Sequence, residues 1–113
     1  MGNSVSITEL SAPNQLKAVN AFAKFYIQLY KTESLEIISS YVPAGYLSDI
    51  NAFITRNRYL TKEGLLAISV EASRTDYVQV IAHLDQNFTS NGVPETPWHD
   101  WLNAHHKQLV KES

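Results

Sequence analysis

The stretch NQLKAVNAFAKFYIQLY, residues 14–30, decides the fold that we expect for this chain of 113 residues. Its apolar side chains recur three and four positions apart, which is the spacing of a broad buried stripe on one α-helix. Pro13 suits the first turn of such a helix, where the backbone N–H groups have no partner within the helix. We therefore expect a helix that organises the core through Leu16, Val19, Phe22, Ala23, Phe25, Tyr26, Leu29 and Tyr30.

Five further segments predict shorter helices around the first one. Their apolar residues also have helical spacing, and residues that cap helices stand before four of them, at Ser34, Thr61, Thr75 and Thr96. Glycine, proline, serine and asparagine mark the segment TSNGVPE, residues 89–95, as a loop. We expect one all-α domain over residues 12–113, with five to six short helices that can stack as hairpins. The expected ranges are 34–42, 46–57, 61–72, 75–88 and 96–110.

Residues 65–84 also fit a β-hairpin, which is the alternative to two helices in this region. Apolar residues alternate along both halves, and a turn at Arg74 would pair them in register. A hairpin after two helices would suit a cone-shaped α+β domain of the NTF2-like type, which binds a ligand or acts as a small enzyme. The alternating residues are Leu66, Ile68 and Val70 in one half and Val78, Val80 and Ala82 in the other.

The composition indicates a globular domain. Hydrophobic residues make up 44% of the chain and charged residues 18%, whereas a disordered chain would carry fewer apolar and more charged residues. Cysteine is absent, which excludes disulfides and thiolate zinc sites and favours a cytoplasmic protein. No apolar run approaches the roughly 18 residues that a membrane span needs.

The charge pattern does not favour nucleic acid as a partner. The net charge is -2, and the nine Lys and Arg residues are scattered along the chain. The densest basic spot is Arg56-Asn57-Arg58, followed by Lys62. We interpret this spot as a solvated helix end, because the negative end of the helix dipole favours arginine.

The first residues, MGNSVS, fit the pattern for N-myristoylation, with Gly2 as the acceptor and Ser6 at the position of the required hydroxyl. One acyl chain gives only marginal membrane binding, and the sequence offers no second signal such as a cysteine for palmitoylation. Residues 1–11 as a whole are polar, and we expect a flexible N-terminal arm there. A myristoylated viral or eukaryotic domain that associates with membranes is one alternative function.

The stretch TPWHDWLNAHHKQLV, residues 96–110, resembles the start of an ankyrin repeat, whose signature is T-P-L-H followed by an apolar pair. A similar outline begins at Gly64, 32 positions earlier. The resemblance spans residues 36–110 and implies stacked helical hairpins that bind another protein. The sequence departs from the family where a glycine is expected at the turn between the paired helices, because Ser73 and His105 stand there.

Three of the four histidines lie close together in this last segment, but their spacing does not suit one metal ion. His99 and His106 would lie about 10.5 Å apart along a helix, and His105 and His106 would point about 100° apart. His83 with Asp85 is the only nearby source of further ligands. We also find no phosphate-binding loop, nucleophile elbow or paired carboxylates, so we expect no metal, no cofactor and no enzymatic activity.

A helix that begins near Pro97 would place Trp98, Trp101 and His105 on one face. Tryptophans at this spacing serve first as core residues, but tryptophan is also enriched at the centres of protein interfaces. We therefore take these three residues as the candidate binding residues. The main functional prediction is a non-catalytic protein-binding module that acts as an inhibitor, an immunity-type protein or an adaptor.

Overall fold

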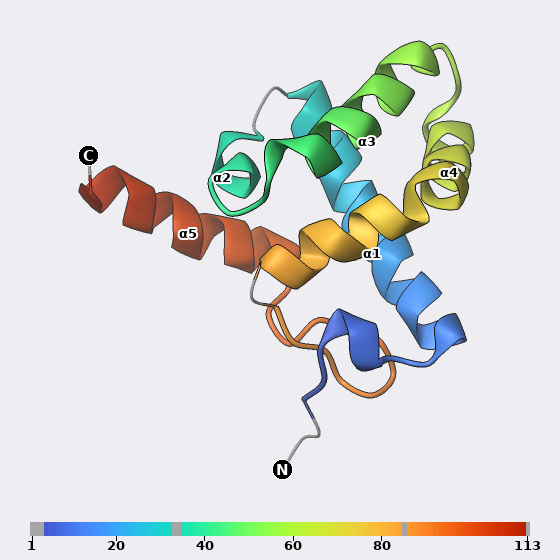
Figure 1. Ribbon diagram of the computed structural model, residues 1–113. Coiled ribbons are helices and arrows are strands. Elements are labelled where there is room, and N and C mark those ends of the chain that lie inside the picture. The colour runs from blue at the N-terminus through green and yellow to red at the C-terminus, as the bar shows by residue number, and fades with distance from the viewer. Residues whose placement is uncertain (1–3, 33–34, 85, 113) are drawn as a thin grey trace.

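The computed structural model describes residues 4–32, 35–84 and 86–112, with the backbone alone from residue 106 onward. These residues form five α-helices and one short 3-10 helix, and their only β-type pairing is in isolated bridges (Figure 1). The all-α prediction is therefore confirmed. The predicted cap Ser34 lies outside the described residues. The elements are η1 (Ile7–Glu9), α1 (Ala12–Lys31), α2 (Glu36–Ser39), α3 (Ala44–Arg56), α4 (Lys62–His83) and α5 (Trp98–Glu112).

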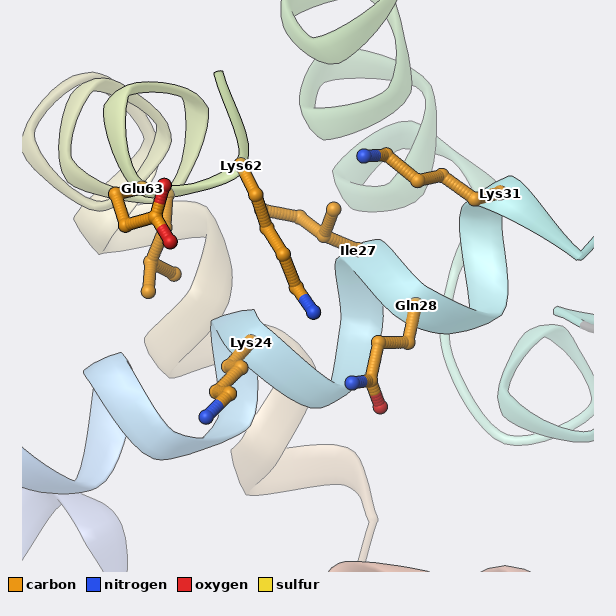
Figure 2. Close-up of a pocket in the computed structure, with 7 residues that line it drawn as sticks. Lys24, Ile27, Gln28, Lys31, Lys62 and Glu63 are labelled. Atoms are coloured by element: carbon orange, nitrogen blue, oxygen red, sulfur yellow. The ribbon is translucent and has the colours of Figure 1, made fainter.

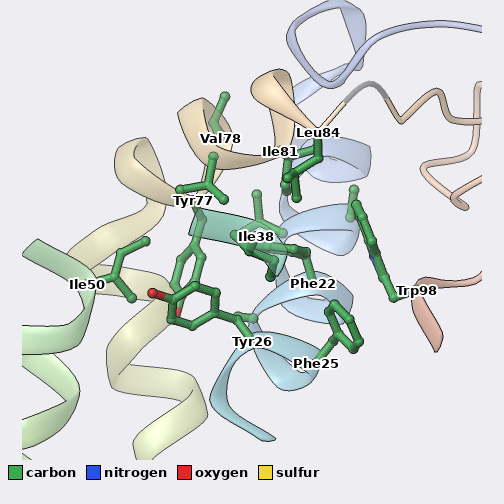
Figure 3. Close-up of a cluster of buried hydrophobic side chains, with 14 of the residues drawn as sticks. Phe22, Phe25, Tyr26, Ile38, Ile50, Tyr77, Val78, Ile81, Leu84 and Trp98 are labelled. Atoms are coloured by element: carbon green, nitrogen blue, oxygen red, sulfur yellow. The ribbon is translucent and has the colours of Figure 1, made fainter. Parts of the chain in front are cut away.

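The helix α1 forms the centre of the domain, as its apolar stripe predicts. It has Pro13 in its first turn, and α4 packs against it (Figure 3). Leu16 departs from the predicted stripe, since it is 38% exposed, and Tyr30 is half-buried. The other six residues of the stripe are buried: Val19, Phe22, Ala23, Phe25, Tyr26 and Leu29.

The two helices that the sequence predicts over residues 61–88 are the two halves of α4, which ends at His83. Its backbone leaves helical geometry only at Ser73, with φ -117° and ψ 20°, and the two halves run in different directions (Figure 1). The polar run after Ala72 therefore makes a kink instead of a turn between two helices, and Thr75 is not a cap. The alternative hairpin is wrong, because both halves are helical and the kink lets each half bury its own apolar residues. The predicted cap Thr61 is confirmed, since its side chain accepts the N–H of Gly64 at 3.1 Å.

The tyrosines in the core have hydrogen-bond partners from the neighbouring helices or from their own. The hydroxyl of Tyr26 donates to Oδ1 of Asn51 at 2.6 Å, which ties α1 to α3. The hydroxyl of Tyr77 lies 2.6 Å from Oγ of Ser69 within α4. Burial raises the pKa of Tyr77 to about 12, and burial likewise raises the pKa of Tyr26. Both phenols are therefore neutral structural groups at physiological pH.

The N-terminal segment packs onto the core over its described part, in contrast to the flexible arm expected from its polar composition. Ile7 is 1% exposed and Leu10 is 8% exposed, because these apolar residues find room against α1 and α4. Val5 pairs with Phe88 through two backbone hydrogen bonds of 2.9 and 2.8 Å. Phe88 thus lies in an extended segment, whereas the sequence predicts it at the end of a helix.

The segment 86–97 leads from α4 to α5 as the predicted loop. Gly92 lies in the left-handed region with φ 85°, and a Cβ atom there would lie 2.5 Å from the carbonyl oxygen of Asn14. The helix α5 begins at Trp98, slightly later than predicted, and the Pro97 carbonyl accepts the N–H of Trp101 at 2.9 Å. In the described part of the chain, no helix is both long and apolar enough to cross a membrane.

Candidate binding surface

The two tryptophans predicted as binding residues lie in the core. Trp98 is 6% exposed and stacks on Phe25, with 5.8 Å between the ring centroids. Trp101 is 4% exposed, and its indole N–H donates to the carbonyl of Leu84 at 3.2 Å. The indole N–H of Trp98 is buried and has no partner within the described residues. Both rings therefore attach α5 to the core and present little surface to another molecule.

The third predicted residue, His105, lies half-buried at the edge of an aromatic cluster. Its ring stacks on Trp101 with the centroids 4.0 Å apart, and the ring of Tyr41 meets it edge-on at 5.4 Å. Its Nδ1 donates to the carbonyl of Trp101 at 2.7 Å. Tyr41 is 38% exposed, so this cluster reaches the surface beside α2.

The other histidines do not gather into one site. His99 is exposed and meets the edge of the Phe25 ring, and His83 donates from Nδ1 to the carbonyl of Gln79 at 2.8 Å. The side chain of His106 and all of Asp85 lie outside the described residues. Over the described ranges, no three histidines and carboxylates lie close enough together to hold a metal ion.

The surface is hollowed along the outward side of α1, and we call this feature the α1 groove. Three adjoining hollows make it up, with volumes of about 200, 480 and 410 Å³. The first is drawn in Figure 2. The N-terminal end of α4 borders the groove on one side, and the start of α5 borders it on the other. Its lining residues are Ala21, Lys24, Phe25, Ile27, Gln28, Leu29, Lys31, Thr32, Lys62, Glu63, Leu66, Pro94, Pro97, Trp98 and His99.

The α1 groove is cationic although the chain as a whole is slightly acidic. Lys24, Lys31 and Lys62 line it with exposed side chains, and among the described lining residues Glu63 is the only carboxylate. Among the described residues, no carboxylate oxygen lies within 4.0 Å of any of these three ammonium groups. Buried Ile27 and half-buried Leu66 supply an apolar floor between the lysines. The groove therefore offers free positive charge over a hydrophobic base.

A further hollow of about 810 Å³ adjoins the groove at Lys31, and we call it the α3–α4 corner. Arg56 ends α3 as predicted, and Arg58 and Tyr59 follow in the turn to α4. Tyr59 is 78% exposed, which is the largest exposure among the large hydrophobic residues in the described part of the chain. The remaining lining residues are Tyr30, Ile54, Thr55 and Leu65.

The two arginines of this corner stand out in the sequence only as the densest basic spot, and neither Tyr59 nor the groove was predicted as a site. One feature of the sequence does indicate a basic surface on α1: Lys17, Lys24 and Lys31 recur every seven residues and so share one helix face. The contributions of Lys62 and His99 have no such signal, because these residues meet α1 only in the folded chain.

No family model, curated protein sequence or solved structure matches this chain. The resemblance to ankyrin repeats therefore stays a prediction. In the structure α5 remains helical through His105, where that resemblance expects the turn between paired helices.

Proposed function

We propose that this domain is a non-catalytic, cytoplasmic protein-binding module, which acts by occupying or tethering another protein as an inhibitor, immunity-type protein or adaptor does. The observation that carries the proposal is the α3–α4 corner. There an almost fully exposed tyrosine stands beside two arginines, at the rim of a hollow of about 810 Å³. Tyrosine and arginine are among the residues that contribute most to binding energy at protein interfaces.

The corner has the physical properties that an interface needs. The Tyr59 ring offers a large rigid surface whose burial against a partner would be favourable, and it loses little conformational entropy on binding. The guanidinium groups of Arg56 and Arg58 can each donate paired hydrogen bonds to carboxylates or carbonyls of a partner. Packing inside the domain uses little of the Tyr59 ring, so its exposure is better explained by a surface that another molecule covers.

The strongly perturbed ionisable groups lie elsewhere and do not favour an enzyme. The largest upward pKa shifts belong to Tyr26 and Tyr77, whose hydroxyls are bonded inside the core. Besides lysine, arginine and tyrosine, the groove contains Glu63 and His99, and no hydrogen bond joins either of them to a nucleophile among the described residues. Binding is therefore the activity that these surfaces support best.

Photo-crosslinking at the corner would test this proposal. A photoreactive phenylalanine at Tyr59 should give a discrete covalent adduct with one protein in the native cells. The same group at Thr8, an exposed residue of η1 at the opposite end of the domain in Figure 1, should give none. The adduct should be lost in an Arg56→Ala/Arg58→Ala variant with an unchanged circular dichroism spectrum. Equal crosslinking at both positions, or none at Tyr59, would reject the corner as an interface.

The membrane-associated alternative rests on Gly2, which lies outside the described residues. It stays a prediction, and the intact mass of the protein purified from its native cells would test it, since myristoylation adds a defined mass to Gly2.

A further inference from the structure

We infer that the segment which a partner protein lays in the α1 groove is acidic and amphipathic, with its apolar side on Ile27 and Leu66 and its carboxylates against Lys24, Lys31 and Lys62. This inference rests on the proposed protein-binding function and names the chemistry of the partner. It is carried by the shape of the groove, by its unpaired charge and by the position of Lys62.

The shape fits a short helix or an extended segment of a partner. The lining residues of α1 extend from Ala21 to Lys31, which corresponds to about 15 Å and nearly three helical turns. Lys24 and Lys31 are seven residues apart, so their Cα atoms lie about 10.5 Å apart along the helix axis. A helix that docks in this groove with acidic residues at a similar spacing could reach both lysines.

The charge of the groove selects an acidic occupant. Three exposed lysines, none with a carboxylate partner among the described residues, stand around an apolar floor, and Figure 2 shows the Lys62 side chain reaching from α4 toward α1 beside Lys24. Such a surface steers an acidic segment into place and strengthens its binding at low ionic strength. The apolar floor adds an attraction that free anions would not use.

Lys62 lies at a position where the fold alone would favour the opposite charge. It is the first residue of α4, and the positive end of the helix dipole destabilises a lysine there and stabilises an acid. The neighbouring Glu63 fits that rule and Lys62 does not. A lysine that is unfavourable for its own helix is readily explained if its charge binds a ligand.

Nucleic acid is the competing anionic partner, and the groove suits it less well. The aromatic rings of Phe25 and Trp98 that line the groove are buried, so they offer little face on which bases could stack.

Fluorescence anisotropy with the purified protein tests the inference directly. The probe is a fluorescein-labelled helical peptide of leucine and glutamate, with its glutamates at three- and four-residue spacing, compared with the same peptide in which every glutamate is glutamine. A labelled oligothymidine of 20 nucleotides tests the competing class, its length being roughly that of a short single-stranded site. The variants are Lys62→Glu in the groove and Lys17→Glu, which makes the same charge change at an exposed residue of α1 that does not line the groove, seven residues before Lys24.

The acidic peptide should bind, its affinity should fall with added salt, and Lys62→Glu should weaken it by about tenfold or more. Lys17→Glu should change the affinity by less than about twofold, because salt screens a charge outside the site. Lys62→Glu should at the same time raise the denaturant midpoint of the domain, so that its loss of binding cannot come from unfolding. The inference is overturned if the glutamine peptide binds equally well, if Lys17→Glu weakens binding as much, or if the oligothymidine binds more tightly.

Crosslinking separates a failure of this inference from a failure of the proposed function. A photoreactive phenylalanine at Gln28, on the floor of the groove, should capture a Glu- and Asp-rich segment of the same protein that is captured at Tyr59. Capture at Tyr59 without an acidic segment at Gln28 would overturn the inference and leave the proposed function standing. Capture at neither position would overturn both.

Discussion

The hydroxyl groups of Ser69 and Tyr77 lie 2.6 Å apart in the core, on opposite sides of the kink at Ser73. Ser69 and Tyr77 are both 0% exposed, so neither hydroxyl can turn to water if the other is removed. This hydrogen bond joins the two halves of α4 and favours the bent form of the helix over a straight one.

We expect Ser69→Ala to lower the free energy of unfolding by about 1–3 kcal/mol, because it leaves the Tyr77 hydroxyl buried without a partner. Tyr77→Phe should cost less than Ser69→Ala, since a helical serine can bond the carbonyl one turn earlier. The double variant should cost less than the sum of the two single variants. Urea unfolding of the unchanged protein, the two single variants and the double variant measures these free energies. Strict additivity of the two single effects would show that the hydrogen bond contributes no coupling energy.

Gly92 is expected to tolerate no side chain. Its φ of 85° disfavours other residues, and an added Cβ would lie 2.5 Å from the Asn14 carbonyl oxygen, which belongs to the first turn of α1. Gly92→Ala should therefore lower the free energy of unfolding by about 2 kcal/mol or more. Gly45→Ala is the matched control, because it lies in α3 with nothing within 4 Å of the added Cβ, and it should stabilise the domain by about 0.5 kcal/mol. Equal effects in thermal unfolding would contradict this account.

The two tryptophans of α5 allow a matched comparison of one hydrogen bond. Trp101→Phe removes the bond from the indole N–H to the Leu84 carbonyl, whereas Trp98→Phe removes a buried N–H that has no partner in the described chain. The two changes remove similar aromatic area, so Trp101→Phe should be the more destabilising by about 1 kcal/mol. Chemical denaturation measures the difference, and a larger loss at Trp98 would show that its N–H has a partner after all.

The carboxyl of Asp76 should make the domain less stable as the pH rises. Burial, and then the charge of Asp49, raises the pKa of Asp76 above its usual value of 3.8. The folded state therefore holds the Asp76 proton more tightly than the unfolded state, and stability falls as the pH rises from about 3.8 through the raised pKa. The loss of folding stability that the Asp76 charge causes is complete above the raised pKa and absent below about pH 3.8.

Asp76→Asn should consequently stabilise the domain at pH 7, by no more than about 0.5 kcal/mol because solvent screens a partly exposed carboxylate. Asp49→Asn should give a smaller gain, since it relieves only the repulsion. Both gains should vanish in denaturant titrations below pH 3.8, the usual pKa of the group. A gain for Asp76→Asn that persists there would mean that its cause is not the charge.

Features that depend on neighbouring residues could be predicted from the sequence. The apolar spacing of α1, its Pro13 and the Thr61 cap act within one or two helical turns, and the structure confirms all three. The predictions fail where contacts with distant segments of the chain determine the backbone conformation. Phe88 has helical spacing to Leu84, yet Val5 offers it a backbone partner in an extended conformation.

The candidate surface was less predictable than the fold for the same reason. The tryptophans were identified by residue type, and burial against Phe25 and Leu84 removes them from the surface. The α1 groove combines Lys24, Lys62 and His99, which lie in three different helices. Their meeting depends on the packing angles of those helices, which the spacing of residues along the chain does not specify.

The packing of the N-terminal segment has a consequence for how the domain is made. Val5 pairs with Phe88, and the Ser4 hydroxyl donates to the Glu95 carboxylate across 91 positions of sequence. A ribosome releases the N-terminus first, so Ser4 and Val5 lack these two partners until residue 95 has emerged. Ile7 and Leu10 pack against α1 and α4, so their burial waits until α4 has emerged as well. The domain should therefore finish folding only after translation has passed its last loop, and a chaperone that shields the nascent N-terminus would raise its yield.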